Sequence, residues 1–382
     1  MTVDWQDQAA GLADALVDQG KLSSPEWIAA VRETPRHLLV PRFFEQVPKT
    51  GEWREISTED DGRTRIYSNV GVYTKIGPDP VWGHTIGLSS TSTPSLITRM
   101  LEALDVHDGH RVLEIGTGTG YNAALLCHRL GDHQVVSVDI EPELVELARE
   151  RLAEINHRPT LAAVDGVHGY PEHAPYDRII ATCAVPEVPW SWISQLRDGG
   201  FALVDIQRSA AAGNLALLRR HGNRAEGRFD SRWANFMPLR TGTAQHLRPP
   251  ERDRNSSTPR PSTIGYVRPW ENTVAWYLAA LTMPADVVFG HTINSDTRNL
   301  GDIFLYAPDG SWCELSGEPD SAGQFHVWEG GPEALWHHVE RAHALYQHSG
   351  EPRWERLGVT VTPTRQWLWL DDPTRGCLCE ID

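Results

Sequence analysis

Three glycines alternate along one short segment, at Gly116, Gly118 and Gly120. The residues before them, 111–115, are mostly β-branched or apolar, and an apolar helical pattern follows at residues 122–130. The sequence therefore predicts a strand, a tight glycine turn and the start of a helix. Because glycine lacks a Cβ atom, such a turn lets the backbone approach a ligand closely. This arrangement is typical of a nucleotide-binding site.

An acidic residue follows at a distance that suits ribose recognition. A second strand-like run, residues 134–138, ends in Asp139, nineteen residues after Gly120. A carboxylate in this position can accept hydrogen bonds from both hydroxyls of a ribose. The two motifs together indicate a nucleoside cofactor, and a plain tight turn without a ligand is the alternative.

The glycine spacing distinguishes between nucleosides. A dinucleotide fingerprint has the pattern G-x-G-x-x-G, but Tyr121 stands where its last glycine belongs. Glu114 also places a negative charge beside the turn, which repels a pyrophosphate and attracts the ammonium and sulfonium groups of S-adenosylmethionine. The sequence therefore predicts S-adenosylmethionine as the cofactor and S-adenosylhomocysteine as its product.

A hydroxyl-rich segment precedes another predicted helix. Thr93 can cap this helix and Pro94 can occupy its first position, and apolar residues recur at helical spacing over residues 97–104. Ser92 and the free N–H groups of the first turn should then gather at the positive end of the helix, which suits a carboxylate. A cap without a bound substrate is the alternative.

Strands and helices alternate from about residue 93 to 206. Residues 141–155 form an amphipathic helix, and residues 161–164 form a strand that ends at Asp165 and Gly166. An acid in that position can accept a hydrogen bond from an adenine amino group. The later elements of the alternation are strands at residues 176–182 and 201–206 and a helix at residues 190–196. This pattern predicts a parallel sheet covered on both faces, with its ligand at the carboxyl ends of the strands.

The composition excludes several classes of protein. A chain of 382 residues with a net charge of −16 lacks the excess of Lys and Arg that nucleic-acid binding needs. Five scattered cysteines support neither a disulfide framework nor a zinc site, so we expect no metal. The N-terminus is acidic and no run of about 18 apolar residues exists, so we expect a cytoplasmic protein without a membrane partner. The oligomeric state stays open.

The regions around the alternating core differ in character. Two short helices are predicted near residues 4–19 and 25–31. Residues 50–84 are polar, and we expect a long loop whose aromatic side chains either anchor it to the core or cover a ligand: Trp53, Tyr67, Tyr73 and Trp82. Residues 241–263 are rich in Arg, Pro, Ser, Thr and Asn and predict an exposed linker.

The last segment, residues 264–382, contains eight of the fifteen tryptophans and is therefore expected to fold. We expect an α+β extension with a hairpin at residues 303–306 and 312–315, a helix near residues 333–346, and strands at residues 359–361 and 366–370. We predict that this extension helps to recognise the substrate. A structural cap and a dimerisation surface are the alternatives.

From about residue 12 to 239 the chain resembles the protein-L-isoaspartate (D-aspartate) O-methyltransferases. The resemblance rests on the glycine turn and on these segments: Pro35-Arg36-His37, residues 86–94, Asp165-Gly166, Gly169-Tyr170, Ala174-Pro175-Tyr176-Asp177, Val188-Pro189 and Leu196-Arg197-Asp198-Gly199-Gly200. It implies an α/β fold for residues 1–240, with a doubly wound, Rossmann-like class I methyltransferase sheet and an N-terminal helical segment.

The resemblance also implies roles for individual residues. In the family, a serine two residues before a proline lies beside the acceptor carboxylate, which implies a catalytic role for Ser92 and substrate contacts for Ser92, Thr93 and Ser95. The cofactor-binding residues implied by the motifs and the resemblance are Glu114, Gly116, Thr117, Gly118, Gly120, Tyr121, Asp139, Ile140, Asp165 and Gly166.

The chain departs from the family in its insert of about thirty residues near residues 50–84, in Thr93 and Ser95, and in its extension. This layout resembles the branch that acts beside lanthipeptide, lasso-peptide or graspetide systems, where an ordinary aspartate of a ring-constrained ribosomal peptide is methylated and then closes to an aspartimide. Our first hypothesis is therefore an aspartyl O-methyltransferase acting on a modified precursor peptide. An isoaspartyl repair methyltransferase and a non-catalytic, cofactor-dependent peptide-binding protein are the alternatives.

Overall fold

The computed structural model describes residues 4–48, 50–59, 62–79, 84–240, 254–293 and 300–381. Ten strands of these residues form one mixed sheet, in the order β19-β18-β17-β11-β10-β9-β8-β5-β6-β7. Its parallel part consists of β5 (Val112–Ile115), β6 (Val135–Asp139), β7 (Thr160–Ala163), β8 (Tyr176–Val185) and β9 (Leu196–Gln207). The alternating part of the chain therefore forms the predicted parallel sheet.

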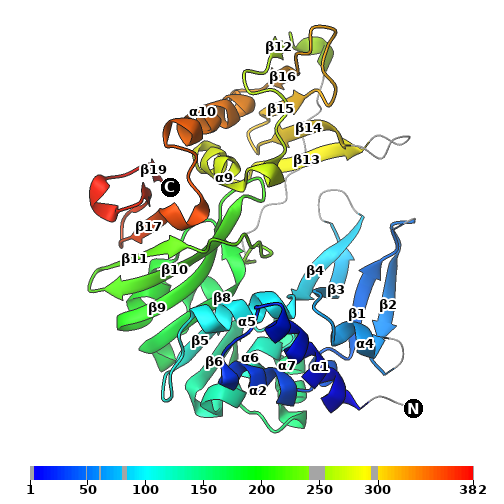
Figure 1. Cartoon of the computed structure of the whole chain (residues 1–382), viewed down its shortest axis with the longest axis vertical. Coiled ribbons are helices and arrows are strands. Elements are labelled where there is room, and N and C mark those ends of the chain that lie inside the picture. Colours follow the sequence, from blue (N-terminus) through cyan, green and yellow to red (C-terminus); the bar gives the residue numbers. More distant parts are fainter. Residues whose placement is uncertain are drawn as a thin grey trace.

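Helices cover both faces of this sheet (Figure 1). On one face lie α1 (Trp5–Asp18), α2 (Pro25–Glu33), α5 (Pro94–Ala103), α6 (Tyr121–Leu130) and α7 (Pro142–Glu154); on the other lie α8 (Trp190–Gln195) and α9 (Thr273–Thr282). Adjacent residues of β5 point to opposite faces, because Val112 belongs to one apolar cluster and Leu113 to the other. The doubly wound α/β fold predicted from the sequence is confirmed.

The glycine turn between β5 and α6 has the backbone that the sequence indicates. Gly116, Gly118 and Gly120 all have positive φ, at 101°, 51° and 83°. A Cβ atom on Gly116 would lie 2.6 Å from the hydroxyl of Thr182, so a larger residue there would have to displace this side chain. The turn therefore lies against the carboxyl end of β8, the strand that pairs with β5.

The extension returns to the central sheet. The antiparallel strands β10 (Gly213–His221) and β11 (Arg224–Phe229) continue the sheet beyond β9, and β17 (Leu357–Val361), β18 (Gln366–Leu370) and β19 (Cys379–Glu380) extend it further. Gln366 is hydrogen bonded to both main-chain groups of Val188, at 3.0 and 2.8 Å. The predicted strands at residues 359–361 and 366–370 are confirmed, and they belong to the same sheet as the glycine turn.

The rest of the extension forms a second sheet, in the order β12-β16-β15-β14-β13. Its strands are β12 (Arg260–Pro261), β13 (Val288–Ile293), β14 (Leu300–Tyr306), β15 (Trp312–Leu315) and β16 (His326–Gly330), and α9 packs against α10 (Leu335–His348) beside them. The predicted hairpin and helix are confirmed. The linker prediction was wrong for residues 254–263, because β12 pairs with β16 there; residues 241–253 lie outside the described residues.

The predicted loop at residues 50–84 was also wrong, because this region contributes strands to a third sheet, β2-β1-β3-β4. The elements are β1 (Arg42–Gln46), β2 (Trp53–Ser57), β3 (Val72–Pro78) and β4 (Thr85–Thr91), with the short helices α3 (Arg36–Leu39) and α4 (Gly62–Ile66). Trp53 packs edge-on against Tyr73 at 5.2 Å, and Tyr67 is hydrogen bonded to His37. Tyr67 is buried and anchors this region to the core, whereas Tyr73 is 43% exposed and lines the cavity described below. Trp82 lies outside the described residues.

Candidate active site

A cavity of about 1480 Å³ lies at the carboxyl ends of the parallel strands. Its walls come from all three sheets: the glycine turn and the end of β8 from the central sheet, β3 and β4 from the N-terminal sheet, and residues 286–289 with Tyr306 from the extension. The segments 207–211 and 235–239 complete the lining. The cavity therefore combines the predicted cofactor motif with parts of the chain that are distant in sequence.

Half of the predicted cofactor residues line this cavity, namely Glu114, Gly116, Thr117, Gly118 and Tyr121. The other half, Gly120, Asp139, Ile140, Asp165 and Gly166, lie outside its lining. Asp139 is only 9% exposed and accepts a 3.0 Å hydrogen bond from the main-chain N–H of Gly118. Asp165 accepts a bond from the N–H of Val167, two residues along. Both acids thus lie at the ends of β6 and β7, as predicted, and their ligand contacts stay predictions.

Glu114 lies at the base of the turn in a fully buried hydrogen-bond network. Its carboxylate accepts bonds from the Asn122 amide, at 2.7 Å, and from the Ser137 hydroxyl, at 2.6 Å. Burial raises the pKa of Glu114 to about 7, although these two donors act in the opposite direction. A nearby cation would restore full ionisation at neutral pH, so Glu114 suits a positively charged ligand.

The residues around the turn fit S-adenosylmethionine. No atom lies within 4 Å of the Cβ position of Gly118, so a ligand can approach the backbone there. Glu114 places beneath the turn a carboxyl group that a bound cation would ionise, and Asp139 places a second carboxyl group beside the turn. S-adenosylmethionine, when bound, supplies a methyl group activated by the sulfonium. The residues of the glycine turn and Asp139 are those that would hold the nucleoside, and these contacts stay predictions.

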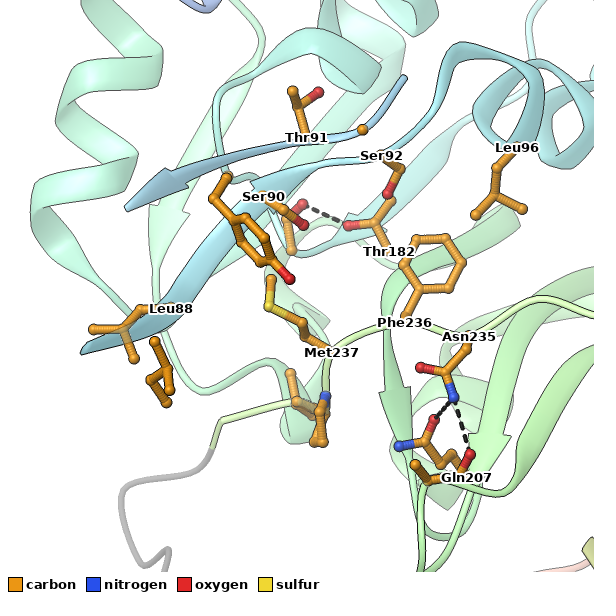
Figure 2. Close-up of a pocket in the computed structure, with 18 of the residues that line it drawn as sticks. Leu88, Ser90, Thr91, Ser92, Leu96, Thr182, Gln207, Asn235, Phe236 and Met237 are labelled. Carbon is orange, nitrogen blue, oxygen red and sulfur yellow. Dashed lines mark hydrogen bonds between the residues drawn. The ribbon is translucent and has the colours of Figure 1, made fainter. Parts of the chain in front are cut away.

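The predicted acceptor residues lie at the end of β4. Ser92 and Thr93 line the cavity, whereas Ser95 does not, and the N–H of Ser95 donates to the side chain of Asn69. Thr93 is the N-cap residue of α5 and Pro94 is its first residue, as predicted, although the Thr93 side chain makes no capping bond. Figure 2 shows Ser92 in the same part of the cavity as Thr182. The turn residue Gly116 reaches this place too, because its carbonyl accepts a 2.8 Å bond from Thr182.

Several lining residues were missed by the sequence interpretation. Thr182 lies at the carboxyl end of β8, where the strand pattern alone would have justified naming it. The segment 235–239 is held against β8 by two bonds with Ala184, from its N–H to Met237 and from Leu239 to its carbonyl. No local pattern marks this segment, or residues 207–211 and 286–289, because their position depends on long-range pairing.

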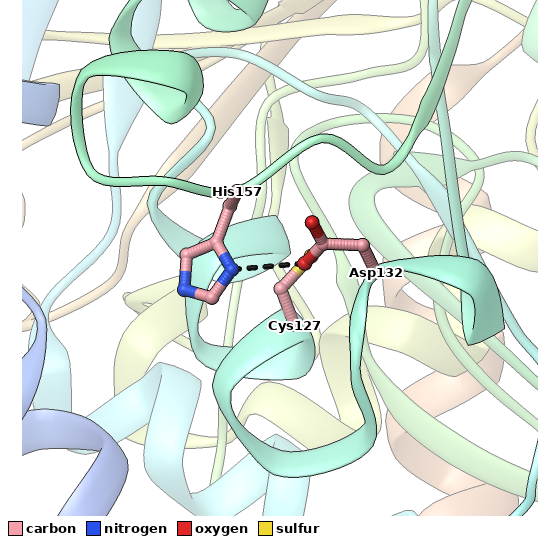
Figure 3. Close-up of side chains that lie close together, drawn as sticks. All are labelled: Cys127, Asp132 and His157. Carbon is pink, nitrogen blue, oxygen red and sulfur yellow. Dashed lines mark hydrogen bonds and ion pairs between the residues drawn. The ribbon is translucent and has the colours of Figure 1, made fainter.

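A separate cluster of Cys127, Asp132 and His157 lies near the C-terminal end of α6 (Figure 3). Their ligand-type atoms all lie within 4.8 Å of one another, as in some metal sites. Both carboxylate oxygens of Asp132 already have partners, the His157 ring at 2.9 Å and the N–H of Arg158 at 2.6 Å. Burial raises the pKa of the Cys127 thiol, which favours its neutral form. These hydrogen bonds join the segment that follows α6, at Asp132, to the segment that follows α7, at His157 and Arg158.

Among the described residues, no helix has both the length and the apolar character needed to cross a bilayer.

The parallel order β7-β6-β5-β8-β9, the glycine turn after β5 and the acid at the end of β6 define a class I methyltransferase that uses S-adenosylmethionine. The family model described as "Protein-L-isoaspartate(D-aspartate) O-methyltransferase (PCMT)" matches residues 7–243. The chain therefore belongs to the protein-L-isoaspartate(D-aspartate) O-methyltransferase family, and it is an S-adenosylmethionine-dependent carboxyl O-methyltransferase.

Relatives agree with this assignment. Protein-L-isoaspartate O-methyltransferase 1 of Archaeoglobus fulgidus is 34% identical over 207 residues, which cover 53% of this chain and 82% of that protein. The protein-L-isoaspartate O-methyltransferase of Methanoculleus marisnigri is 35% identical over 222 residues, 58% of this chain and 82% of the relative. A solved structure named protein-L-isoaspartate O-methyltransferase aligns with 95% of this chain and 99% of its own, at a TM-score of 0.55 and 21% identity. That last similarity concerns the fold, and it includes most of the extension.

Proposed function

We propose that the protein methylates the free carboxylate of an isoaspartyl residue in a protein or peptide. The observation that carries this proposal is that Ser92, at the start of α5, shares one cavity with the glycine turn. The carboxylate acceptor and the cofactor would therefore both have a place within one cavity. The family and the relatives support the isoaspartyl acceptor over the ordinary aspartate of our first hypothesis.

The proposed chemistry needs little from acid–base groups. A carboxylate has an unperturbed pKa near 4 and is ionised at pH 7, so no general base is required. One carboxylate oxygen forms a bond to the methyl carbon as the carbon–sulfur bond breaks, and the electron pair of that bond stays on sulfur. Ser92 and the N–H groups of the first turn of α5 would hold the carboxylate in line. The cavity walls, which come from three sheets, would shield the reacting pair from part of the surrounding water.

A second candidate is the ring-constrained aspartyl peptide, whose methyl ester would close to an aspartimide. The observation that favours it is that Val287, Val288 and Phe289 of the extension line the same cavity as Ser92 and could contact a bulky peptide. The extension by itself does not distinguish the two candidates, since a protein named as an isoaspartate methyltransferase shares this fold over nearly the whole chain. We propose the cytoplasm as the location in either case.

Methyl transfer to matched peptides tests the proposal. The full chain is incubated with methyl-labelled S-adenosylmethionine and with linear peptides that differ only in an isoaspartyl or an aspartyl residue at one position. We expect a base-labile methyl ester on the isoaspartyl peptide alone. Transfer to a cyclised aspartyl peptide but to neither linear peptide would favour the second candidate. Cofactor binding without transfer to any peptide would support the non-catalytic alternative.

A further inference from the structure

Arg208 is a cation without a counter-charge on the cavity wall. Among the described lining residues it is the only Lys or Arg, and the charged side chains that share the lining are Asp79, Glu114 and Asp286. Within the described part of the chain, Arg208 takes part in no ion pair, and its buried Nε has no hydrogen-bond partner. The buried Nε–H of this partly buried side chain therefore lacks a hydrogen-bond acceptor, and a buried donor without a partner is unfavourable. An anionic ligand would supply the missing partner.

The loop that carries Arg208 has an unfavourable backbone that the extension holds in place. Ala210 and Ala211 both have left-handed φ, at 51° and 53°, which residues with a Cβ atom rarely adopt. The N–H of Ala210 donates to Val287 at 2.7 Å, and the Trp276 indole donates to the carbonyl of Ala210 at 3.0 Å. Such strain persists where the surrounding structure fixes it, often at ligand sites. The extension therefore positions Arg208 in the cavity.

Gln207, the chain neighbour of Arg208, is separated from the predicted acceptor position at Ser92 (Figure 2). Gln207 accepts a 2.7 Å hydrogen bond from Asn235. Figure 2 shows Phe236 and Asn235 between Ser92 and Gln207. A peptide whose acceptor carboxylate lies at Ser92 would thus extend past Phe236 before it reaches the loop of Arg208. The guanidinium should meet a different group of the same peptide.

We propose that Arg208 binds a second carboxylate of the acceptor peptide. The proposal rests on the proposed function, because it takes a carboxylate at Ser92 as the first anchor. A guanidinium binds a carboxylate with two parallel hydrogen bonds, which a neutral amide in its place cannot reproduce. The second carboxylate is either an acidic side chain near the acceptor or the C-terminus of a short peptide. In a chain with a net charge of −16, this local cation offsets the general repulsion of an anionic peptide.

Binding of three matched isoaspartyl peptides tests this proposal. The first carries a Glu near the acceptor and a C-terminal amide, the second carries Gln and an amide, and the third carries Gln and a free C-terminal carboxylate. Their dissociation constants are measured by calorimetry on the full chain saturated with S-adenosylhomocysteine. We expect the first or the third peptide to bind about tenfold more tightly than the second, as one charge-assisted contact provides. Whichever peptide binds more tightly identifies the source of the carboxylate.

The variants Arg208→Ala and Arg208→Lys complete the experiment. Arg208→Ala should abolish the preference and leave the affinity for the second peptide unchanged, and Arg208→Lys should keep part of the preference. The control Arg353→Ala removes a charge from a side chain that is 85% exposed and is not among the lining residues, so the preference should persist. Circular dichroism checks that each variant is folded.

Equal binding of the three peptides by the parent protein, or a preference that survives Arg208→Ala, would overturn the proposal. Calorimetry separates this outcome from failure of the proposed function, since it requires no methyl transfer. An Arg208-dependent preference without ester formation would support the second anchor and refute the proposed reaction. Ester formation on all three peptides at equal rates and affinities would refute the second anchor and support the proposed reaction.

Discussion

The guanidinium of Arg36 donates a hydrogen bond to the main-chain carbonyl of Ser92, across 3.2 Å. The same group donates to the carbonyls of Ile66, at 2.8 Å, and Val70, at 3.4 Å, and it lies 5.0 Å from the ring centre of Tyr121. Arg36 is fully buried, and burial lowers its pKa. A single side chain thus connects the end of β4 with the residues before β3 and with the first residue of α6.

Replacement of this side chain should destabilise the protein and impair catalysis together. Arg36→Met leaves buried carbonyls without donors, so we expect a loss of about 3–5 kcal/mol in the free energy of unfolding, measured by urea denaturation. Transfer should fall as well, because the main chain at Ser92 loses its anchor. Arg36→Lys should recover only part of the stability, since an ammonium cannot reach all three carbonyls. A loss below about 1 kcal/mol for Arg36→Met would contradict this role.

The hydroxyl of Ser92 should matter for transfer and not for the cofactor. We expect Ser92→Ala to lower kcat/KM for the acceptor peptide by roughly tenfold or more, the effect of one hydrogen bond to a charged group. The dissociation constant of S-adenosylmethionine should stay unchanged. Ser95→Ala is the matched control, since Ser95 does not line the cavity. Unchanged turnover of the Ser92 variant would exclude the Ser92 hydroxyl from the reaction. The N–H groups in the first turn of α5 would then be the remaining candidates for binding the acceptor carboxylate.

Asp139 should contribute to cofactor affinity. We expect Asp139→Ala to weaken binding of S-adenosylmethionine by roughly 1.5–3 kcal/mol, because a carboxylate that accepts bonds from ribose hydroxyls would be lost. The variant also loses the acceptor for the Gly118 N–H, which orders the glycine turn. Calorimetry measures the effect, and Asp139→Asn, which keeps one acceptor oxygen, should lose less. An affinity within about twofold of the parent would exclude Asp139 as the ribose acid.

Asp205 should make stability depend on pH. It is fully buried on β9, where one oxygen accepts a 2.8 Å bond from the N–H of Phe236 and the other has no partner. Burial raises its pKa from 3.8 to about 7, so the folded protein binds this proton more tightly than the unfolded chain. The free energy of unfolding should therefore fall as the pH rises from about 4 to 7.

The neutral variant Asp205→Asn should remove this dependence and still accept the bond from Phe236. The free energy of unfolding of the variant minus that of the parent should increase by on the order of 2–4 kcal/mol as the pH rises from 5 to 8. Denaturation curves across this range measure the difference between the two proteins. The pKa of Glu114 is raised to about 7 as well, but Glu114 is present in both proteins and its contribution drops out of the difference. A constant difference at all pH values would show that Asp205 keeps one protonation state.

Gln366 should be important for attachment of the C-terminal strands. Its amide satisfies both main-chain groups of Val188, which is fully buried. We expect Gln366→Ala to cost about 2–4 kcal/mol in thermal or urea unfolding, because two buried polar groups lose their partner. Gln347→Ala, on the exposed side of α10, is the control and should have little effect. A chain shortened near Leu239 would be a poorer test, since it also exposes the edge of β11.

The cofactor side of the cavity could be predicted from short stretches of sequence. The glycine turn, Glu114 and Asp139 lie within 26 residues, and their positions depend on local geometry: a turn that needs positive φ and an acid at the end of the next strand. Their contacts with the cofactor stay predictions. The start of α5 could also be predicted from a local signal, because Thr93 and Pro94 are a typical N-cap residue and first helical residue. The N-terminal sheet was mistaken for a loop because its strands expose many polar side chains, as at β2.

The other walls of the cavity were decided by tertiary structure. Strand β17 pairs with β11 across more than a hundred residues of intervening chain, and no local pattern specifies which edge a strand will join. That pairing, together with the packing of α9, brings Val287 to the loop of Arg208 and gives an unremarkable arginine its place in the cavity. The sequence alone determined the class of cofactor and the type of reaction, because these depend on contiguous residues. The surroundings of the acceptor depend on contacts between distant segments, which only the folded chain brings together.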